Sequence, residues 1–191
     1  TNINANTPIQ VGNDNDWSYI SSGANFTIAL KTDGTLWSWG KNDKGQLGDG
    51  SATDKNMPTQ IGNQNTWKTI STKFSHTLAL KIDGTLWAWG SNEYGEIGNG
   101  GQVFPPVYIP TQIGTTSTWI SISAGGWYSL ALKSDSTLWA WGDNSSGALG
   151  DGTNINKTIP TQIETDTNWQ YISSGLDNNI ATKSDGTFWF W

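Results

Sequence analysis

The amino-acid sequence predicts an all-β fold assembled from four copies of one unit. A short stretch in which one residue separates two tryptophans occurs at 34–40, 84–90, 137–142 and 186–191. The first tryptophans of these copies, at 37, 87, 139 and 189, are 50, 52 and 50 residues apart. A fixed period of this length is typical of repeat architectures. The sequence shows no sustained helical period, whereas short runs that alternate large and small residues return in every copy.

Each unit is expected to contain four short strands. The first strand begins on a tryptophan and is expected at 17–21, with counterparts starting at Trp67, Trp119 and Trp169. The second strand is expected at 27–31, 77–81, 129–133 and 179–183. The third strand is the two-tryptophan stretch itself.

The turn between the second and third strands carries Asp-Gly in three of the four units, at 33–34, 83–84 and 185–186. Asp-Gly between two alternating runs is a strong hairpin signal, because glycine supplies the positive φ that the turn needs. The third unit has Ser136 in place of this glycine, so its turn is expected to be slightly strained.

The fourth strand of each unit is a short run that starts with proline. These runs lie at 58–61, 110–113 and 160–163, with a further copy at 8–11 near the start of the chain. Because proline cannot donate a backbone hydrogen bond, the run is expected to form the outer, edge strand of its sheet.

Four-stranded antiparallel units that return about every 50 residues are typical of the blades of a β-propeller, which pack face to face. Ser38, Ala88 and Ala140 lie between the paired tryptophans and leave room for the rings of a neighbouring blade. In the last unit Phe190 and Thr182 depart from the pattern, as terminal repeats often do. The chain is expected to form one propeller domain, 1–191, with repeats at about 1–50, 51–100, 101–152 and 153–191.

The composition argues against several classes of partner. Of the 191 residues 35% are hydrophobic, and thirteen tryptophans supply much of the area available for burial. The net charge of −6 and the absence of clustered Lys and Arg argue against a nucleic-acid partner. There is no cysteine and no apolar run of membrane-spanning length. The polar N-terminal stretch does not have the pattern of a signal peptide, so a signal for export would lie outside this sequence.

Residues 39–50 resemble the signature of the regulator of chromosome condensation repeat family, as do 89–100 and 141–152. Each copy keeps an asparagine, at Asn42, Asn92 and Asn144. Residues 74–80 resemble the loop-His-Thr segment of the same family, although the other units have Phe26, Tyr128 and Asn178 in place of His76. The resemblance implies a propeller, usually of seven blades, that mostly binds other proteins.

The order of the strands leaves the closure of the ring open. The chain is expected to start with a fourth strand, 8–11, and to end with a third strand at Trp191. It could form a four-bladed ring closed by its own N-terminal strand, or a homodimer in which two copies exchange this strand and close an eight-bladed ring, or a fragment of a longer propeller. We favour the homodimer, because the unpaired edges of a half ring invite association.

No pattern in the sequence predicts catalysis, a metal or a cofactor. Asn42, Asp43 and Asp49 lie in a glycine-rich loop that lacks the ligand spacing of a calcium site, and an Asn-capped turn is expected there. His76 is the only histidine and has no nucleophile motif beside it. The aspartates at 33, 83, 135 and 185 recur with the repeat and are read as turn residues. We therefore expect the protein not to be an enzyme.

A protein-binding surface is expected on the face that carries the loops after the first and third strands. These loops differ strongly between units and are rich in aromatic residues, which protein interfaces use as anchors. Trp127 is the only tryptophan outside the repeating positions. The candidate partner-binding residues are Asn25, Phe26, Phe74, His76, Tyr94, Phe104, Tyr108, Trp127, Tyr128, Asp177 and Asn178.

Two other functions compete with protein binding. A glycan-binding propeller would require similar pockets in all units, whereas variation between the loops favours one large asymmetric protein partner. The high identity between units also fits a truncated or engineered repeat array without a partner of its own. A further reading of the aromatic loops is that Phe26, Phe74 and Tyr128 fill the base of the loops as core residues.

Overall fold

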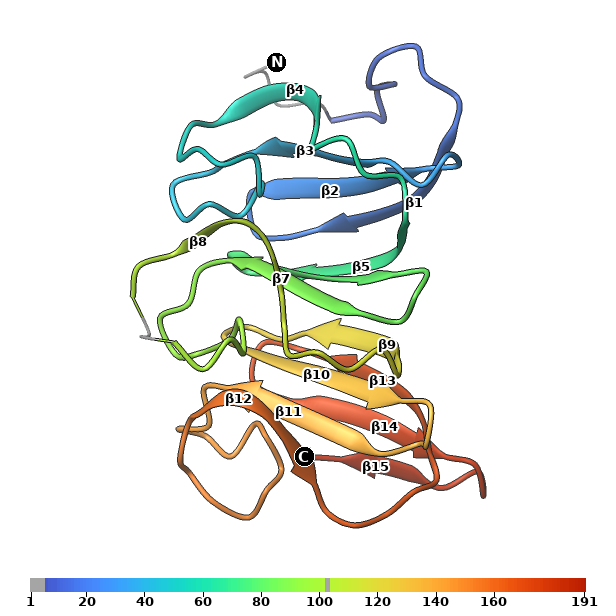
Figure 1. Cartoon of the computed structure of the whole chain (residues 1–191), viewed down its shortest axis with the longest axis vertical. Coiled ribbons are helices and arrows are strands. Elements are labelled where there is room, and N and C mark those ends of the chain that lie inside the picture. Colours follow the sequence, from blue (N-terminus) through green and yellow to red (C-terminus); the bar gives the residue numbers. More distant parts are fainter. Residues whose placement is uncertain (1–5, 102–103) are drawn as a thin grey trace.

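The computed structural model describes residues 6–101 and 104–191 and contains only β-strands and loops in these ranges (Figure 1). The first three antiparallel sheets follow one another along the long axis, and the fourth overlaps the third in this view. Within the described residues, no helix is long and apolar enough to cross a membrane.

Each sheet is one blade, and its strands are paired in chain order. The first three blades have four strands each and the last has three. The strands are β1 (Trp17–Ser22), β2 (Phe26–Lys31), β3 (Leu36–Gly40) and β4 (Lys55–Gln60); β5 (Trp67–Lys73), β6 (His76–Lys81), β7 (Leu86–Gly90) and β8 (Val107–Gln112); β9 (Trp119–Ala124), β10 (Tyr128–Lys133), β11 (Leu138–Gly142) and β12 (Lys157–Ile163); and β13 (Trp169–Ser174), β14 (Asn179–Lys183) and β15 (Phe188–Phe190).

The fourth strands begin three residues earlier than the sequence indicates, so each proline lies inside its strand. Pro58 lies in the middle of β4, next to a register shift between Ser38 and Gly40 of β3. The outer edge and the irregular pairing remove the need for a backbone donor at this position.

The N-terminal run at 8–11 does not form a strand in the structure. It is exposed, and Val11 lies beside Trp17 and Tyr19 at the first blade rather than beside β15. The sheet of β13, β14 and β15 consequently lacks a fourth strand, and the single chain does not form a closed four-bladed ring. Closure by the N-terminal strand within one chain, one of the three expectations above, is therefore wrong for this structure.

The first strands of the blades form the inner layer. β1 contacts β5, β5 contacts β9, and β9 contacts β13, whereas the fourth strands lie at the outer end of each sheet. This order aims the loops after the first strands of the blades, and after the third strands of the first three blades, towards the same edge of the molecule, on the left in Figure 1.

The hydrophobic core lies between successive blades. Trp67 and Trp89 of the second blade pack with Ile28 and Leu36 of the first, and Leu47 from the loop after β3 completes the cluster. The same arrangement recurs between the second and third blades and between the third and fourth. Because each tryptophan offers a large ring to the facing aliphatic side chains, a chain with few hydrophobic residues still forms continuous cores.

The two end blades each keep one uncovered face. Phe188 and Phe190 of the last blade are 65% and 68% exposed, although their counterparts Leu36 and Ser38 are fully buried. At the other end Trp39 is only half-buried, whereas its counterpart Trp89 is fully buried.

Candidate protein-interaction surface

Three aromatic side chains lie together on the loop edge of the second and third blades. The ring centroids of Phe74 and Trp127 are 4.7 Å apart, and those of Tyr94 and Trp127 are 6.3 Å apart. Phe74 is 40% exposed, Tyr94 is 38% exposed and Trp127 is half-buried. We call Phe74, Tyr94 and Trp127 the aromatic surface.

The backbone holds the aromatic surface in place. Phe74 follows β5 in a tight loop and has a φ of +41°, which is uncommon for a bulky residue. Its carbonyl accepts a hydrogen bond of 3.1 Å from the Ala24 backbone N–H of the first blade. On the other side Gly126 N–H donates to Leu176 O of the last blade at 3.1 Å. These bonds tie loops of different blades together and reduce the freedom of the exposed rings.

The loop that carries Tyr94 is fixed by a buried carboxylate. Tyr94 N–H donates to Glu96 Oε2 at 2.8 Å, and the Ser91 hydroxyl donates to Glu96 Oε1 at 2.8 Å. Burial raises the pKa of Glu96 above its ordinary value. An ion pair of 2.6 Å between Lys44 Nζ and Glu93 Oε1 joins this loop to the equivalent loop of the first blade.

Phe26 and Tyr128, two further candidates, fill the base of the loops. Their side chains are 4% and 1% exposed, and their rings lie against Gly23 and Gly125, where an added Cβ would clash. The Tyr128 hydroxyl donates to the carbonyl oxygen of Asn178 at 3.0 Å, and burial raises its pKa. Because both side chains are buried, they offer little surface to a partner.

The comparisons with known proteins agree with this architecture. The family model described as the regulator of chromosome condensation (RCC1) repeat matches residues 33–80, 83–132 and 135–181. The chain belongs to this repeat family. A second model of the same repeat matches 17–46, 67–96 and 119–148. Proteins of the family generally act by binding or as exchange factors rather than as enzymes.

Solved structures of similar proteins share the fold of this RCC1-repeat chain. Human WBSCR16 matches with a TM-score of 0.82 and 23% identity over 94% of this chain and 48% of its own. A chain in the structure of Kap60 bound to yeast RCC1 (Prp20) matches with a TM-score of 0.85 and 22% identity over 97% and 46%. Prp20p from Saccharomyces cerevisiae matches with a TM-score of 0.78 and 24% identity over 87% and 43%. The chain spans less than half the length of these proteins, and no curated protein matches its sequence.

The His position of the repeat is occupied by a buried side chain. His76 is 1% exposed, and its Nε2 lies 3.1 Å from Ser129 Oγ. The Ser129 hydroxyl donates to Glu96 O at 2.8 Å, so its proton is engaged and His76 Nε2 must be the donor to Ser129. Burial lowers the pKa of His76 to about 4. A neutral imidazole without solvent access supports packing between repeats rather than catalysis.

The other candidate residues differ in their exposure. Phe104 is 55% exposed, and Asn25, Asp177 and Asn178 are also exposed. Tyr108 is half-buried, and Gly45 lies against it so closely that a Cβ there would come within 2.8 Å of its ring.

The Asn-capped turns of the RCC1 repeat are confirmed. Asn42 is fully buried, its Nδ2 donates to Asp49 Oδ1 at 3.0 Å, and its Oδ1 accepts from Leu47 N–H at 3.0 Å. Asn144 makes the same bonds to Asp151 and Leu149. In the ranges 6–101 and 104–191, no group of three or more His, Cys, Asp or Glu side chains could hold a metal ion.

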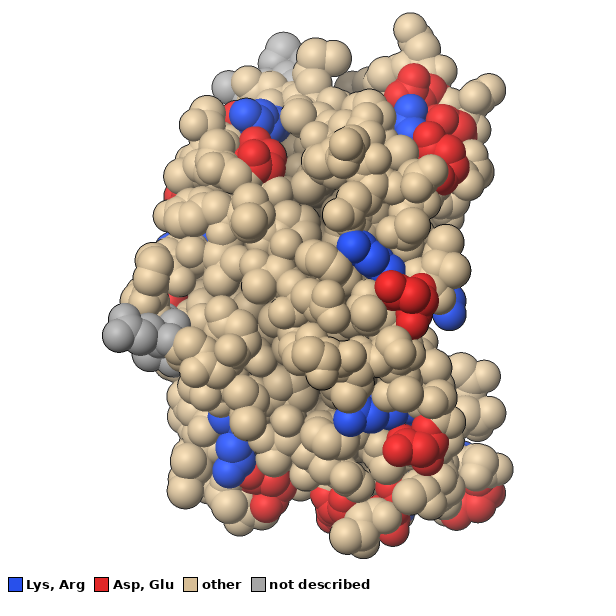
Figure 2. Space-filling model, viewed as in Figure 1, with Lys and Arg blue, Asp and Glu red and all other residues tan. Residues whose placement is uncertain are grey.

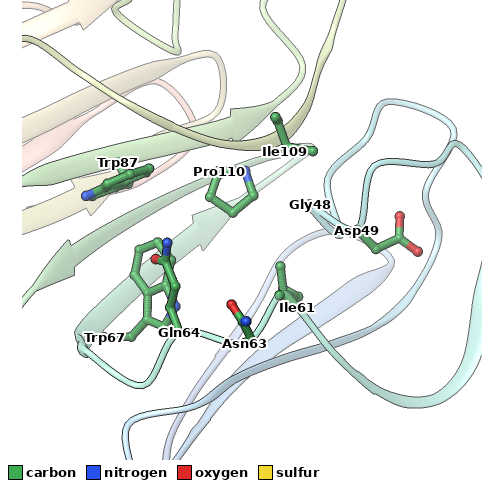
Figure 3. A pocket seen from close by; sticks show the side chains of 10 residues that line it. Gly48, Asp49, Ile61, Asn63, Gln64, Trp67, Trp87, Ile109 and Pro110 are labelled. Atoms are coloured by element: carbon green, nitrogen blue, oxygen red, sulfur yellow. The ribbon is translucent and has the colours of Figure 1, made fainter.

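The structure also contains hollows that the sequence did not reveal. Three equivalent hollows open between successive blades at the outer rim, each beside a tryptophan of a first strand and a tryptophan of a third strand. Figure 3 shows one of about 280 Å³, with Trp67 and Gln64 on one side, Ile61 on the other and Pro110 above. The recurrence of the tryptophans predicts a core role for them and gives no sign of the polar loop that lies beside them.

Proposed function

We propose that this chain is a non-enzymatic protein-binding module and that the aromatic surface anchors its partner. The observation that carries the proposal is the cluster of Phe74, Tyr94 and Trp127, which is partly exposed and held on loops tied to neighbouring blades. Aromatic side chains on rigid loops contribute large contact area at a small loss of conformational entropy. Asn25, Phe104, Tyr108, Asp177 and Asn178 are proposed as the polar and aromatic margin of the same interface.

The relatives and the charge distribution support a protein partner. Prp20p binds Gsp1p and histones, and yeast RCC1 is seen bound to Kap60. Figure 2 shows small groups of acidic and basic side chains side by side along the margins, without a large basic patch on this face. With a net charge of −6, the chain lacks the clustered positive charge that a nucleic-acid backbone requires.

Affinity capture followed by a binding measurement tests this proposal. The partner captured by the wild-type chain is identified, purified and titrated against Trp127→Ala and against Ile82→Ala, a 68% exposed residue on the opposite edge. Loss of a central anchor is expected to weaken binding about 30-fold or more. Ile82→Ala is expected to bind like the wild type. Equal affinity of Trp127→Ala and wild type would overturn the assignment of the surface.

We further propose that two copies close an eight-bladed ring as a homodimer, each providing residues 8–11 as the missing strand beside β15 of the other. The uncovered faces at the two ends support this proposal. Trp17 and Trp39 repeat the face that the second blade presents to the first, and Phe188 and Phe190 occupy positions that are buried between the other blades.

The backbone at these ends supports the same contact. Trp67 N–H donates to Gly34 O, and Trp119 N–H donates to Gly84 O, across successive blades. The corresponding groups at the open ends are Trp17 N–H and Gly186 O. Light scattering over a wide concentration range is expected to give twice the chain mass of 20.7 kDa. Phe190→Asp is expected to give the chain mass alone, and a monomeric wild type at every concentration would rule the dimer out.

Glycan binding through the loops receives no support from the aromatic surface. The counterparts of Phe74 are Ala24, Gly126 and Leu176, and those of Trp127 are Asn25, Ser75 and Asp177. None of these is aromatic, so the loops do not provide the equivalent pockets that this function requires. A repeat array without a partner is the outcome if the wild-type chain captures no partner.

A further inference from the structure

Four lysines occupy equivalent places over pairs of tryptophan rings, one in each blade. In the third blade Lys133 Nζ lies 3.5 Å from the ring centroid of Trp139 and 4.7 Å from that of Trp119. Lys31, Lys81 and Lys183 lie over the corresponding rings of their own blades. The ring faces attract the ammonium group and hold it at the outer rim.

The first and last blades neutralise this ammonium with their own carboxylate. Asp14 Oδ2 lies 2.8 Å from Lys31 Nζ, and Asp166 pairs with Lys183 in the same way. Each aspartate stands 17 residues before its lysine, on the loop that leads into the first strand. In the two central blades this position holds Gln64 and Thr116.

The central lysines therefore lack an internal anion. Among the described residues, no carboxylate lies within ion-pairing distance of Lys81 or Lys133. Asp135 acts on Lys133 only at longer range, and its Oδ1 accepts a bond of 2.6 Å from the Thr137 hydroxyl. Burial lowers the pKa of Lys133, whereas hydrogen bonding to Asp14 raises the pKa of Lys31.

The two central lysines differ in their access to solvent. Lys81 is buried and is not part of the lining of the hollow in its blade. Lys133 is only partly buried and lines a hollow of about 380 Å³. The hollow beside Trp169 and Trp189, in the blade where Asp166 pairs with Lys183, is about 110 Å³.

The hollow at Lys133 offers polar groups as well as the ammonium. Its other lining residues include Asn99, Thr115 and Thr116, with Ile159 and Pro160 on the apolar side. The indole Nε1 of Trp119, which also lines it, is buried and has no hydrogen-bond partner among the described residues, and the same holds for Trp67 and Trp169 beside the other two hollows. A buried donor without an acceptor calls for an explanation that a bound ligand or water can supply in any of the three hollows, so the feature that distinguishes this one is the accessible ammonium of Lys133.

We propose that this hollow is a binding site for a small ring-shaped carboxylate of the uronic-acid class. The ligand carboxylate takes the position relative to Lys133 that Asp166 takes relative to Lys183. Asn99, Thr115 and Thr116 provide the amide and hydroxyl groups that pair with sugar hydroxyls, and the volume fits a single ring at the lower end of ligand pockets.

This site is separate from the proposed protein-binding surface. Lys133 ends β10 and Trp119 begins β9, whereas Trp127 lies in the loop at the other end of these two strands. The inference goes beyond the proposed function and does not rest on it, since each can fail while the other stands.

Calorimetric titration of the wild-type chain at pH 7 and low salt tests the site with three probes: glucuronate, glucose and acetate. Glucuronate is expected to bind with a dissociation constant in the millimolar range, because a single charge-assisted contact at a partly open site carries most of the affinity. Glucose, which lacks the carboxylate, and acetate, which lacks the ring, are each expected to bind about tenfold or more weakly.

Two variants introduce the aspartate of the end blades at the equivalent position of a central blade, and they serve as a matched pair. Thr116→Asp installs the internal carboxylate of the last blade and is expected to reduce glucuronate binding about tenfold or more. Gln64→Asp makes the same exchange at buried Lys81 and is expected to leave binding unchanged. Thermal unfolding of both variants confirms that they fold.

Three results would overturn the proposal: no glucuronate binding by the wild type, equal binding of glucuronate and either of the other probes, or undiminished binding by a folded Thr116→Asp.

Discussion

The indole N–H of Trp89 donates a hydrogen bond of 3.0 Å to the backbone carbonyl of Gln46, which lies in the loop of the preceding blade. Trp141 and Trp191 make the same bond to Glu96 O and Ala148 O, at 2.8 and 3.0 Å. Gly48 stands so close to the Trp89 ring that a Cβ would lie 2.6 Å from its Nε1. The loop around Gly48 and the second tryptophan of the next unit therefore depend on each other: the loop supplies the acceptor for the indole N–H, and its glycine leaves room for the ring.

Trp89→Ala is expected to lower the free energy of unfolding by about 3–5 kcal/mol, because it removes a fully buried ring and the indole donor to the Gln46 carbonyl, which then keeps only the Thr77 hydroxyl at 3.3 Å. Denaturant unfolding monitored by circular dichroism measures the change. Trp127→Ala, at the half-buried aromatic surface, is the control and is expected to change stability by less than about 1 kcal/mol. A near-neutral Trp89→Ala would contradict the packing between blades.

Ser136→Gly is expected to stabilise the third blade by about 1 kcal/mol, because Ser136 has a φ of +62° where the equivalent Gly34 and Gly84 have +80° and +78°. The predicted strain in this turn is confirmed by that angle. The reverse change, Gly84→Ser, is expected to destabilise more strongly, since a Cβ there would lie 2.3 Å from the Ser117 carbonyl oxygen. Thermal unfolding of both variants measures the difference, and stabilisation by both would contradict the argument.

Strand identity and blade order were predictable because each depends on local alternation that recurs with the repeat. The Asp-Gly turns, the paired tryptophans and the family signature all agree at this level. The interior position of Pro58 was not predictable, because it depends on a register shift between β3 and β4 that no local pattern marks. Residues 8–11 have the composition of a strand, but the open edge at β15 belongs to the last blade, whereas Val11 lies beside the first blade.

The candidate site was predictable only as a set of loops. The exposure of a ring depends on its position in the loop. Phe26 and Tyr128 lie over Gly23 and Gly125, whereas Phe74 stands two positions earlier in its loop, has a φ of +41° and is 40% exposed. The site at Lys133 was not predicted from the sequence. Asp14 and Asp166 each stand 17 residues before the lysine with which they pair, whereas Thr116 stands at this place before Lys133. The difference between aspartate and threonine becomes informative only when the structure shows that the loop lies against the lysine.

His76→Gln is expected to remove a pH dependence of stability between pH 6.5 and 4. In the folded chain the pKa of His76 is lowered from 6.5 to about 4, so in this range only the unfolded chain takes up the proton. Stability due to this group is therefore complete above pH 6.5 and falls as the pH decreases, by about 3 kcal/mol at pH 4. The difference between wild-type and variant unfolding free energies, measured at several pH values, isolates the histidine. A difference that is constant with pH would contradict the burial of a neutral imidazole.

Glu96→Gln is expected to stabilise the protein at pH 7. Burial raises the pKa of Glu96 above 4.5, so the folded chain holds its proton more tightly than the unfolded chain. The contribution of this group to stability is complete below pH 4.5 and is lost as the pH rises through the folded-state pKa, opposite in sign to that of His76. Glutamine keeps an oxygen for Tyr94 N–H and a donor for the Ser91 hydroxyl oxygen, and Gln46 already makes the equivalent bond to Lys44 N–H at 2.8 Å in the first blade. In denaturant titrations the stability gain of Glu96→Gln should therefore be small at pH 4 and grow towards pH 7. Glu93→Gln, at the partly exposed ion pair with Lys44, is the control and should show no such gain. A variant less stable than the wild type at pH 7 would mean that the charged form of Glu96 is the one that holds the Tyr94 loop in place.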